Sequence, residues 1–420
     1  MLDRTTPPAS KRISSINFTK AESISLSNGT PVHIIHAGQH DIVRLEIIMK
    51  SGRWFETEKG LAYFTSQMLL EGTSGKSSKE LADIFEFHGG HVSINSGIDY
   101  NTFEVYTLSS KLEEIIDVVG QCLSDPVFPG QELNILKDIQ KQQLRINNEK
   151  NNFVAGKEIR KLLYGNTHPY GRPLEIEDMG DTLNSGLLRQ YYQERLLNDV
   201  EIIISGKVTD DLIRNLEVLN FLPAGNVKIL KHAFEDPGNA ETTIEKPDSL
   251  QSSIRLGRRI IQKTHVDYIG LVILNELFGG FFGSRLMKNI REEKGYTYGV
   301  HSSIFSNIHD SFWVIGTDVK KEFVNDTIDQ VYFEMDRLGS DWVSKDELEL
   351  VQNYMLGHFI SSLETSFSLA DKFKNIHFFG QDYSFYDQYV NTINSITPER
   401  LNELAKTYLK PSAFKRAVVG

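Results

Sequence analysis

The sequence has little of three features that would assign a protein class directly: cysteine, long apolar runs and positive charge. Its 420 residues include one cysteine, Cys122, so no disulfide can form within the chain, which is typical of a reducing compartment. No run of about 18 apolar residues occurs, so no membrane-spanning helix is expected. The net charge of −11 argues against a nucleic-acid partner, because phosphate binding needs a basic face.

The N-terminal segment also lacks the pattern of a secretory signal. Its first residues, MLDRTTPPASKRISS, contain neither an apolar h-region nor a small-residue cleavage site. We therefore expect no secretory signal and a cytoplasmic location. A periplasmic location stays open if a signal has been removed from the chain.

What the chain does contain is a weak internal repeat. Residues 111–144 resemble residues 322–356, and each segment predicts an amphipathic helix, a short turn and a second helix. Residues 182–206 and 395–420 both predict a helix followed by a strand that ends in glycine. These final glycines, Gly206 and Gly420, are 214 residues apart. The pattern predicts two homologous halves.

A polar segment separates the predicted halves. Residues 232–253 contain two prolines and no apolar periodicity, so we expect a linker there, between an N-terminal domain of residues 1–231 and a C-terminal domain of residues 254–420. Within each half, alternating apolar and polar residues around turn signals predict antiparallel strands, and helix pairs follow them. The fold class expected is α+β, with a mostly antiparallel sheet covered by helices in each half.

The stretch GLAYFTSQMLLEGT, residues 60–73, predicts a short helix. Its apolar residues share one side of that helix: Leu61, Phe64, Met68 and Leu69. Tyr63 and Gln67 are four residues apart and share another face, with Ser66 beside them. Considered alone, this pattern is typical of a packed core helix.

The context of this helix adds a resemblance. Residues 51–106 resemble the N-terminal segment of the pitrilysin/insulinase family of zinc metallopeptidases, in which the equivalent helix carries His-x-x-Glu-His. The flanking residues of the family pattern are present: Gly52, Glu56, Gly60, Leu61, Ala62, Glu71, Gly72 and Thr73. The resemblance therefore covers the surroundings of the motif.

The resemblance also implies that the zinc site is degenerate. The two family histidines fall on Tyr63 and Gln67, the glutamate that activates water falls on Ser66, and the distal glutamate ligand falls on Gln143. Phenol and amide groups are poor zinc ligands, and no carboxylate is left to take a proton from water. We expect no metal or other cofactor in this chain, and zinc in a partner chain instead.

Other histidines form two clusters in the sequence. One contains His33, His36 and His40, and the other contains His88 and His91. On a strand, His33 and His36 point to opposite faces. Neither cluster is expected to bind a metal, because no cysteine or well-spaced carboxylate completes a tetrahedral set.

The second half carries another resemblance to the same family, in residues 274–304. Family members have a glycine-rich turn, a helix and a strand that supply an arginine/tyrosine pair to the zinc site across a closed chamber. Arg291 and Tyr298 occupy these positions, seven residues apart. Both side chains can donate hydrogen bonds to a peptide carbonyl that becomes an oxyanion. Considered alone, they are more typical of a helix-end cation and a strand aromatic.

The resemblance covers the whole chain and implies a function. Family members of this length form one half-shell of a clam-like dimer around a peptide substrate. We expect a catalytically silent subunit, without activity alone, that lends Arg291 and Tyr298 to a homologous zinc-bearing subunit in a heterodimer. The alternatives are a structural or assembly protein and a peptide-binding homodimer without peptidase activity.

Overall fold

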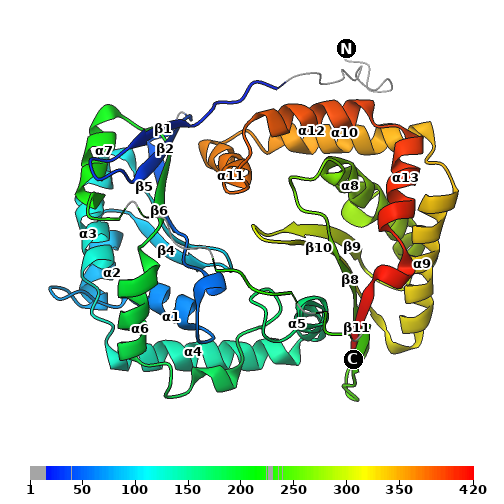
Figure 1. The fold of residues 1–420 in the computed structure, drawn as a ribbon, viewed down its shortest axis with the longest axis horizontal. Helices are drawn as coiled ribbons and strands as arrows, with labels where there is room; N and C mark the ends of the chain where they lie inside the picture. Colours follow the sequence, from blue (N-terminus) through cyan, green and yellow to red (C-terminus); the bar gives the residue numbers. More distant parts are fainter. Residues whose placement is uncertain (1–15, 39, 224, 226–229, 235, 239) are drawn as a thin grey trace, which may run out of the picture.

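The computed structural model describes residues 16–420 except 39, 224, 226–229, 235 and 239, so the expectation about the N-terminal segment lies outside the described residues. Two β-sheets stand at opposite sides of the molecule, each with helices on its outer side (Figure 1). This arrangement confirms the predicted α+β class. Among the described helices, none combines the length and the apolar composition that a membrane span requires.

The first sheet contains six strands and the second contains five. In spatial order the first consists of β1 (Glu22–Ser25), β2 (Pro31–His36), β6 (Val200–Gly206), β3 (Ile42–Met49), β5 (Asn101–Leu108) and β4 (His91–Ser96). The second consists of β7 (Glu241–Ile244), β11 (Lys415–Val419), β8 (Gln251–Ile260), β10 (Ser311–Lys320) and β9 (Val300–Ser306).

The two sheets have the same topology. The order β2-β6-β3-β5-β4 in the first sheet corresponds to β7-β11-β8-β10-β9 in the second. In each sheet one pair is parallel, β2 with β6 and β7 with β11, and the equivalent remaining pairs are antiparallel. The internal repeat seen in the sequence is therefore a repeat of the fold, and the prediction of two homologous halves is confirmed.

The helices follow the same repeat. The first half contains α1 (Leu61–Gln67), α2 (Ser78–Phe87), α3 (Leu112–Ser124), α4 (Gly130–Glu149), α5 (Asn151–Tyr164), α6 (Ser185–Tyr191) and α7 (Asp210–Asn215). The second contains α8 (Tyr268–Asn275), α9 (Val324–Ser340), α10 (Lys345–Ser361), α11 (Ser366–His377), α12 (Ser384–Ser395) and α13 (Pro398–Tyr408). The predicted helix pairs correspond to α3 with α4 and α9 with α10.

Part of the segment expected as a linker belongs to the second sheet. Residues 241–244 form β7, which pairs with β11, and β8 begins at Gln251. The sequence 241–244 is too short and too polar to show a strand pattern, because β7 is an edge strand with half of its residues in solvent.

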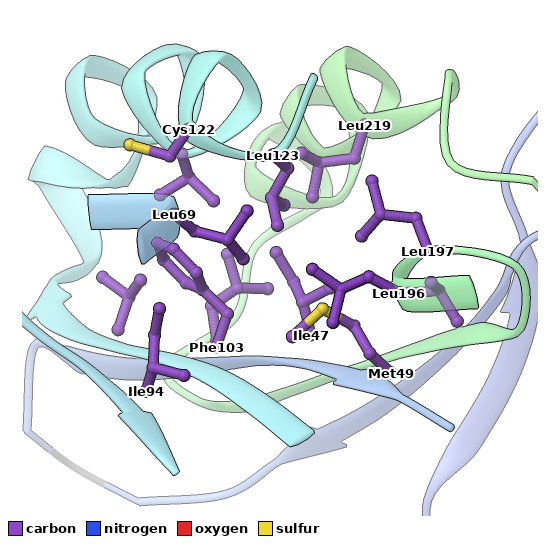
Figure 2. Close-up of a cluster of buried hydrophobic side chains, with 14 of the residues drawn as sticks. Ile47, Met49, Leu69, Ile94, Phe103, Cys122, Leu123, Leu196, Leu197 and Leu219 are labelled. Atoms are coloured by element: carbon purple, nitrogen blue, oxygen red, sulfur yellow. The ribbon is translucent and has the colours of Figure 1, made fainter. Parts of the chain in front are cut away.

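The main core of the first half lies between its sheet and the outer helices. Alternate residues of β3 enter this core, as the two-residue period of a strand requires: Val43, Leu45, Ile47 and Met49. In Figure 2, Ile47 and Met49 face Leu69, Cys122 and Leu123 from the helical layer. Burial raises the pKa of the Cys122 thiol to about 12, so this side chain behaves as a small apolar group.

The opposite face of each sheet is covered by a helix from the other half. α11 lies against β2 and β6 of the first sheet, and α5 lies against β8 and β11 of the second (Figure 1). The first residues of these helices are 215 positions apart, close to the spacing of the repeat. The buried side chains between α11 and the sheet are Ile35, Ile48 and Ile203 of the strands and Leu369, Ala370 and Phe373 of the helix. The two halves therefore exchange equivalent helices.

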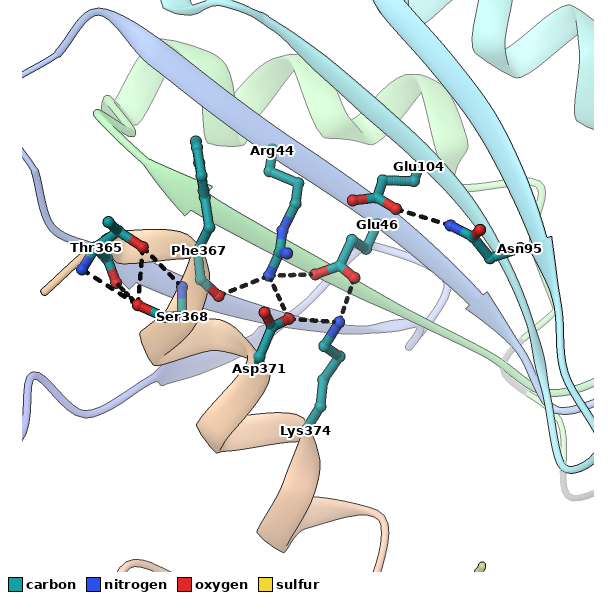
Figure 3. A network of polar contacts seen from close by, with 9 residues as sticks. All are labelled: Arg44, Glu46, Asn95, Glu104, Thr365, Phe367, Ser368, Asp371 and Lys374. Atoms are coloured by element: carbon teal, nitrogen blue, oxygen red, sulfur yellow. Dashed lines mark hydrogen bonds and ion pairs between the residues drawn. The ribbon is translucent and has the colours of Figure 1, made fainter. Parts of the chain in front are cut away.

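Charged groups also hold α11 on the first sheet. The buried Arg44 of β3 binds Glu46 at 3.0 Å and Asp371 of α11 at 2.9 Å (Figure 3). Lys374 of α11 binds Asp371 at 2.9 Å and also contacts Glu46. Two positive and two negative side chains thus neutralise one another between strand and helix, which is the condition under which buried charges are tolerated.

Candidate functional site

The helix predicted from residues 60–73 is present and begins after Gly60. Gly60 has a φ of 86°, a left-handed conformation that glycine adopts without strain. α1 runs from Leu61 to Gln67, and a 3-10 turn continues it to Leu70. The buried Glu56 accepts a hydrogen bond from the Ala62 amide at 3.2 Å and so neutralises the start of the helix.

The three degenerate positions of α1 lie together, and each is bonded within the protein. The Tyr63 hydroxyl donates to Gln140 at 3.2 Å, and the Gln67 amide donates to the Ile94 carbonyl at 2.8 Å. The Ser66 hydroxyl donates to the carbonyl of Tyr63 at 2.9 Å. Tyr63 and Gln67 therefore attach α1 to α4 and to the sheet, and Ser66 bonds within the helix.

The structure places the fourth predicted position elsewhere. Gln143 is exposed on α4, and the residue of α4 that contacts Tyr63 is Gln140, one turn earlier. The prediction of Gln143 counts residues from Gln67, and so it assumes that the segment between them has the length usual in the family. A difference of three residues moves the contact by one helical turn.

The residues around Tyr63 do not fit a zinc ion. Tyr63 lines a cavity of about 160 Å³ together with Glu56, Gln140 and Arg172. The Arg172 guanidinium lies 3.6 Å from the Glu56 carboxylate and would repel a divalent cation. Burial raises the pKa of Glu56 to about 7, although Arg172 and Arg53 oppose the shift. One carboxyl group, a phenol and an amide offer no set of zinc ligands.

In the second half, Arg291 lies on a helix with a wide turn. Residues Met287–Glu293 form a π-helix, and Gly295 follows with a φ of 67°, the left-handed conformation in which many helices end. Tyr298 was expected within a strand. The structure places it in the bend before β9, which begins at Val300, so its side chain is free of the sheet and 92% exposed.

Arg291 and Tyr298 contact one another. The centre of the Arg291 guanidinium lies 5.4 Å from the ring centroid of Tyr298 and 4.4 Å from that of Phe282. A guanidinium between two aromatic rings is held by cation–π attraction, which leaves its N–H groups free to donate in the plane. Sequence reasoning missed Phe282, although an aromatic residue inside the glycine-rich turn 278–285 was its signal.

The pair faces a large open cavity. Arg291, Tyr298, Phe282 and the glycine-rich turn line a cavity of about 760 Å³. Within the part of the chain that the structure describes, neither the Arg291 guanidinium nor the Tyr298 hydroxyl has a hydrogen-bond or ion-pair partner. Among the described residues, none lines both this cavity and the one around Tyr63.

Comparison with known proteins gives matches to one family in both halves of the chain. The family model for insulinase (peptidase family M16) matches residues 32–175, and the model for the peptidase M16 inactive domain matches residues 182–355. The chain is 27% identical over 374 residues to the uncharacterized zinc protease YmxG of Bacillus subtilis, and the match covers 87% of this chain and 90% of the relative. It is 22% identical over 377 residues to the non-peptidase homolog YmxG of Helicobacter pylori, covering 87% and 85%.

The same fold occurs in solved structures. The peptidase M16 inactive domain from Pseudomonas fluorescens superposes with a TM-score of 0.86 at 22% identity, over 95% of this chain and 98% of that one. The two family models together cover most of the chain, and the residues of its first helix do not fit zinc. The chain belongs to the insulinase family of peptidases and is a member of the inactive type, without the zinc-binding motif.

Proposed function

We propose that this chain is the non-catalytic subunit of a heterodimeric zinc peptidase. It encloses the peptide substrate together with a homologous zinc-bearing subunit, and Arg291 and Tyr298 donate hydrogen bonds to the scissile carbonyl in that subunit's active site. The observation that supports this role is that both donors face one open cavity and have no partner among the described residues. A scaffold would have no need to leave two such donors free.

The chemistry of the pair fits this role. When water attacks a peptide carbonyl, negative charge develops on its oxygen, and a guanidinium and a phenol placed in advance stabilise that charge. Phe282 limits the movement of Arg291 by stacking on its guanidinium. The pair supplies no nucleophile and no proton acceptor for water, so it contributes to catalysis only with a zinc-bearing chain.

The first step of the test is isolation of the native complex by affinity purification of this chain. A chain of similar size with an intact His-x-x-Glu-His helix is expected to co-purify, and the complex should cleave peptides until zinc is chelated. If this chain instead purifies as a homodimer that binds peptides without cleaving them, the heterodimer is excluded.

The second step tests the donors in the complex. Arg291→Ala is expected to lower kcat/KM by about 10²-fold and Tyr298→Phe by about 10-fold or more, since each removes a donor to the oxyanion. Matched controls are Lys288→Ala, which removes an exposed cation of the same helix, and Tyr296→Phe, which removes a hydroxyl bonded to Asp326. If the first two variants cleave peptide at the rate of these controls, the donor role is wrong.

A further inference from the structure

Three possible metal ligands from distant parts of the chain converge at the contact between the halves. They are His33 of β2, Glu201 of β6 and His377, the last residue of α11. Glu201 Oε2 lies 3.2 Å from His33 Nε2 and 2.6 Å from His377 Nε2. Among the described residues this is the one group of histidine, cysteine and acidic side chains whose ligand atoms all lie within 4.8 Å of one another.

The group is enclosed on one side and open on the other. The side chains of His33 and Glu201 are 7% and 9% exposed, and that of His377 is 31% exposed. The Phe373 ring packs against both imidazoles, with ring centroids 4.8 and 4.9 Å apart. An ion can therefore enter from solvent beside His377 and meet ligands fixed in the interior.

We propose that His33, Glu201 and His377 bind a Zn²⁺ ion that joins the two halves of the chain. Two imidazole nitrogens and one carboxylate oxygen are a favourable donor set for zinc, and a water molecule on the exposed side completes a tetrahedron. This site is separate from α1, where the donor chemistry does not fit a metal. Neither histidine cluster of the sequence predicts it, because the fold brings its ligands together from residues 33, 201 and 377.

Neighbouring groups orient the ligands, as in protein metal sites generally. The Nδ1 of His33 is 2.8 Å from the Ser23 hydroxyl, which directs Nε2 toward Glu201. Lys50 binds Oε1 of Glu201 at 2.7 Å and leaves Oε2 for the ion.

Small movements suffice to admit the ion. With bonds of about 2.0 Å, the ligand atoms of a tetrahedral zinc lie about 3.3 Å apart. His33 and Glu201 already have this separation, and His377 must retreat from Glu201 by less than about 1 Å at the exposed end of α11. The two imidazole nitrogens lie within 4.8 Å of one another. Lys50 opposes the ion as a cation, but it has a second partner, Asp199, at 3.2 Å. Its ammonium can turn to that carboxylate when zinc binds.

The test uses the untagged full chain after treatment with a chelator. Titration calorimetry and elemental analysis should show one zinc per chain at micromolar zinc. His377→Gln keeps a donor toward Glu201 but removes the imidazole, and it should weaken binding at least about tenfold. Ser23→Ala removes only the orienting hydroxyl and should weaken binding by about tenfold. His36→Gln, an exposed histidine at the end of the same strand, is the control and should bind like the wild type.

A second readout separates a metal site from a simple hydrogen bond. Zinc should raise the Tm of the wild type and of His36→Gln, but not that of His377→Gln, because an ion bound only by the folded chain stabilises it. The circular dichroism of each metal-free variant verifies its fold. If His377→Gln fails to fold, the comparison of Ser23→Ala with the wild type still tests the proposal, because Ser23 is exposed. A wild-type chain that binds no zinc, or variants that bind it like His36→Gln, would overturn the proposal.

Discussion

At the scale of single residues, the two halves treat their polar groups in opposite ways. The side chains of Tyr63, Ser66 and Gln67 all bond within the protein, and those of Tyr63 and Gln67 fasten α1 to α4 and to the sheet. The Arg291 guanidinium contacts the rings of Tyr298 and Phe282. Among the described residues, neither it nor the Tyr298 hydroxyl has a hydrogen-bond or ion-pair partner. One site is closed by its own bonds, and the other presents free donors to solvent.

Glu56 provides a prediction about pH. Its pKa is raised from 4.5 to about 7 by burial, so the folded chain favours the protonated carboxyl. The resulting stabilisation is fully present below pH 4.5 and is lost as the pH rises through about 7, and it amounts to roughly 3 kcal/mol at most. The free energy of unfolding of the wild type should therefore fall over this window relative to that of Glu56→Gln, which cannot ionise.

Denaturant titrations at several pH values measure this difference. Glu58→Gln, a change at an exposed glutamate two residues away, is the control and should follow the wild type at every pH. Parallel profiles of the wild type and Glu56→Gln between pH 4.5 and 8 would contradict the raised pKa.

The sequence predicts part of the candidate site and misses the rest for definable reasons. A stop at Gly295 places Arg291 near Tyr298, because the chain turns back within one residue of a helix end. The stacking of Phe282 depends on how the glycine-rich turn folds back, which no local pattern specifies. Gln140 replaces Gln143 as the contact of Tyr63 because chain distance does not fix which turn of α4 faces α1.

At the scale of elements, the exchange of α5 and α11 is the main feature that the sequence does not predict. Each of the two helices has a buried apolar stripe. The apolar stripe does not specify which sheet the helix covers, because it can pack on any apolar face of the right width. The charges of Arg44, Glu46, Asp371 and Lys374 add specificity, because the two side chains of each half are neutralised by those of the other in this pairing.

Phe373 tests the attachment of α11. It is 7% exposed and packs on Ile35, Ile48 and Ile203 of the first sheet. Phe373→Ala should lower the free energy of unfolding by about 3–5 kcal/mol, because it leaves a cavity between helix and sheet. Guanidinium denaturation measures the loss.

A matched phenylalanine serves as the control. Phe333 of α9 is 51% exposed, so Phe333→Ala should change the free energy of unfolding by less than about 1 kcal/mol. Equal losses for the two variants would mean that α11 is only loosely attached to the first sheet.

At the scale of the whole molecule, the repeat links sequence and fold most directly. The spacing of Gly206 and Gly420 locates the last strands of the halves, β6 and β11, which occupy equivalent places in the two sheets. The polar composition of residues 232–253 conceals β7, the equivalent of β2, because an edge strand needs few apolar residues.

Separate expression of the halves tests their mutual dependence. A chain of residues 1–240 lacks α11, so the face of Ile35, Ile48 and Ile203 becomes exposed to water. We expect this fragment to aggregate or to bind a hydrophobic dye, and residues 241–420 to behave likewise without α5. Co-expression should restore a soluble pair.

Size-exclusion chromatography and dye fluorescence report the outcome. The full chain under the same conditions is the control and should elute without bound dye. A monomeric, cooperatively unfolding fragment of either half would show that the exchanged helix is dispensable.

The exchange also limits how the molecule can move. Hinge opening between the halves would pull α11 and α5 from the opposite sheets at once, and the buried ion pairs of Arg44 and Glu46 would break with them. A fluctuation of that cost is rare, so the two halves move as one body. If the chain encloses a peptide together with a second subunit, as we propose, the substrate enters through the contact between the two chains, and the opening of that contact sets the rate of entry.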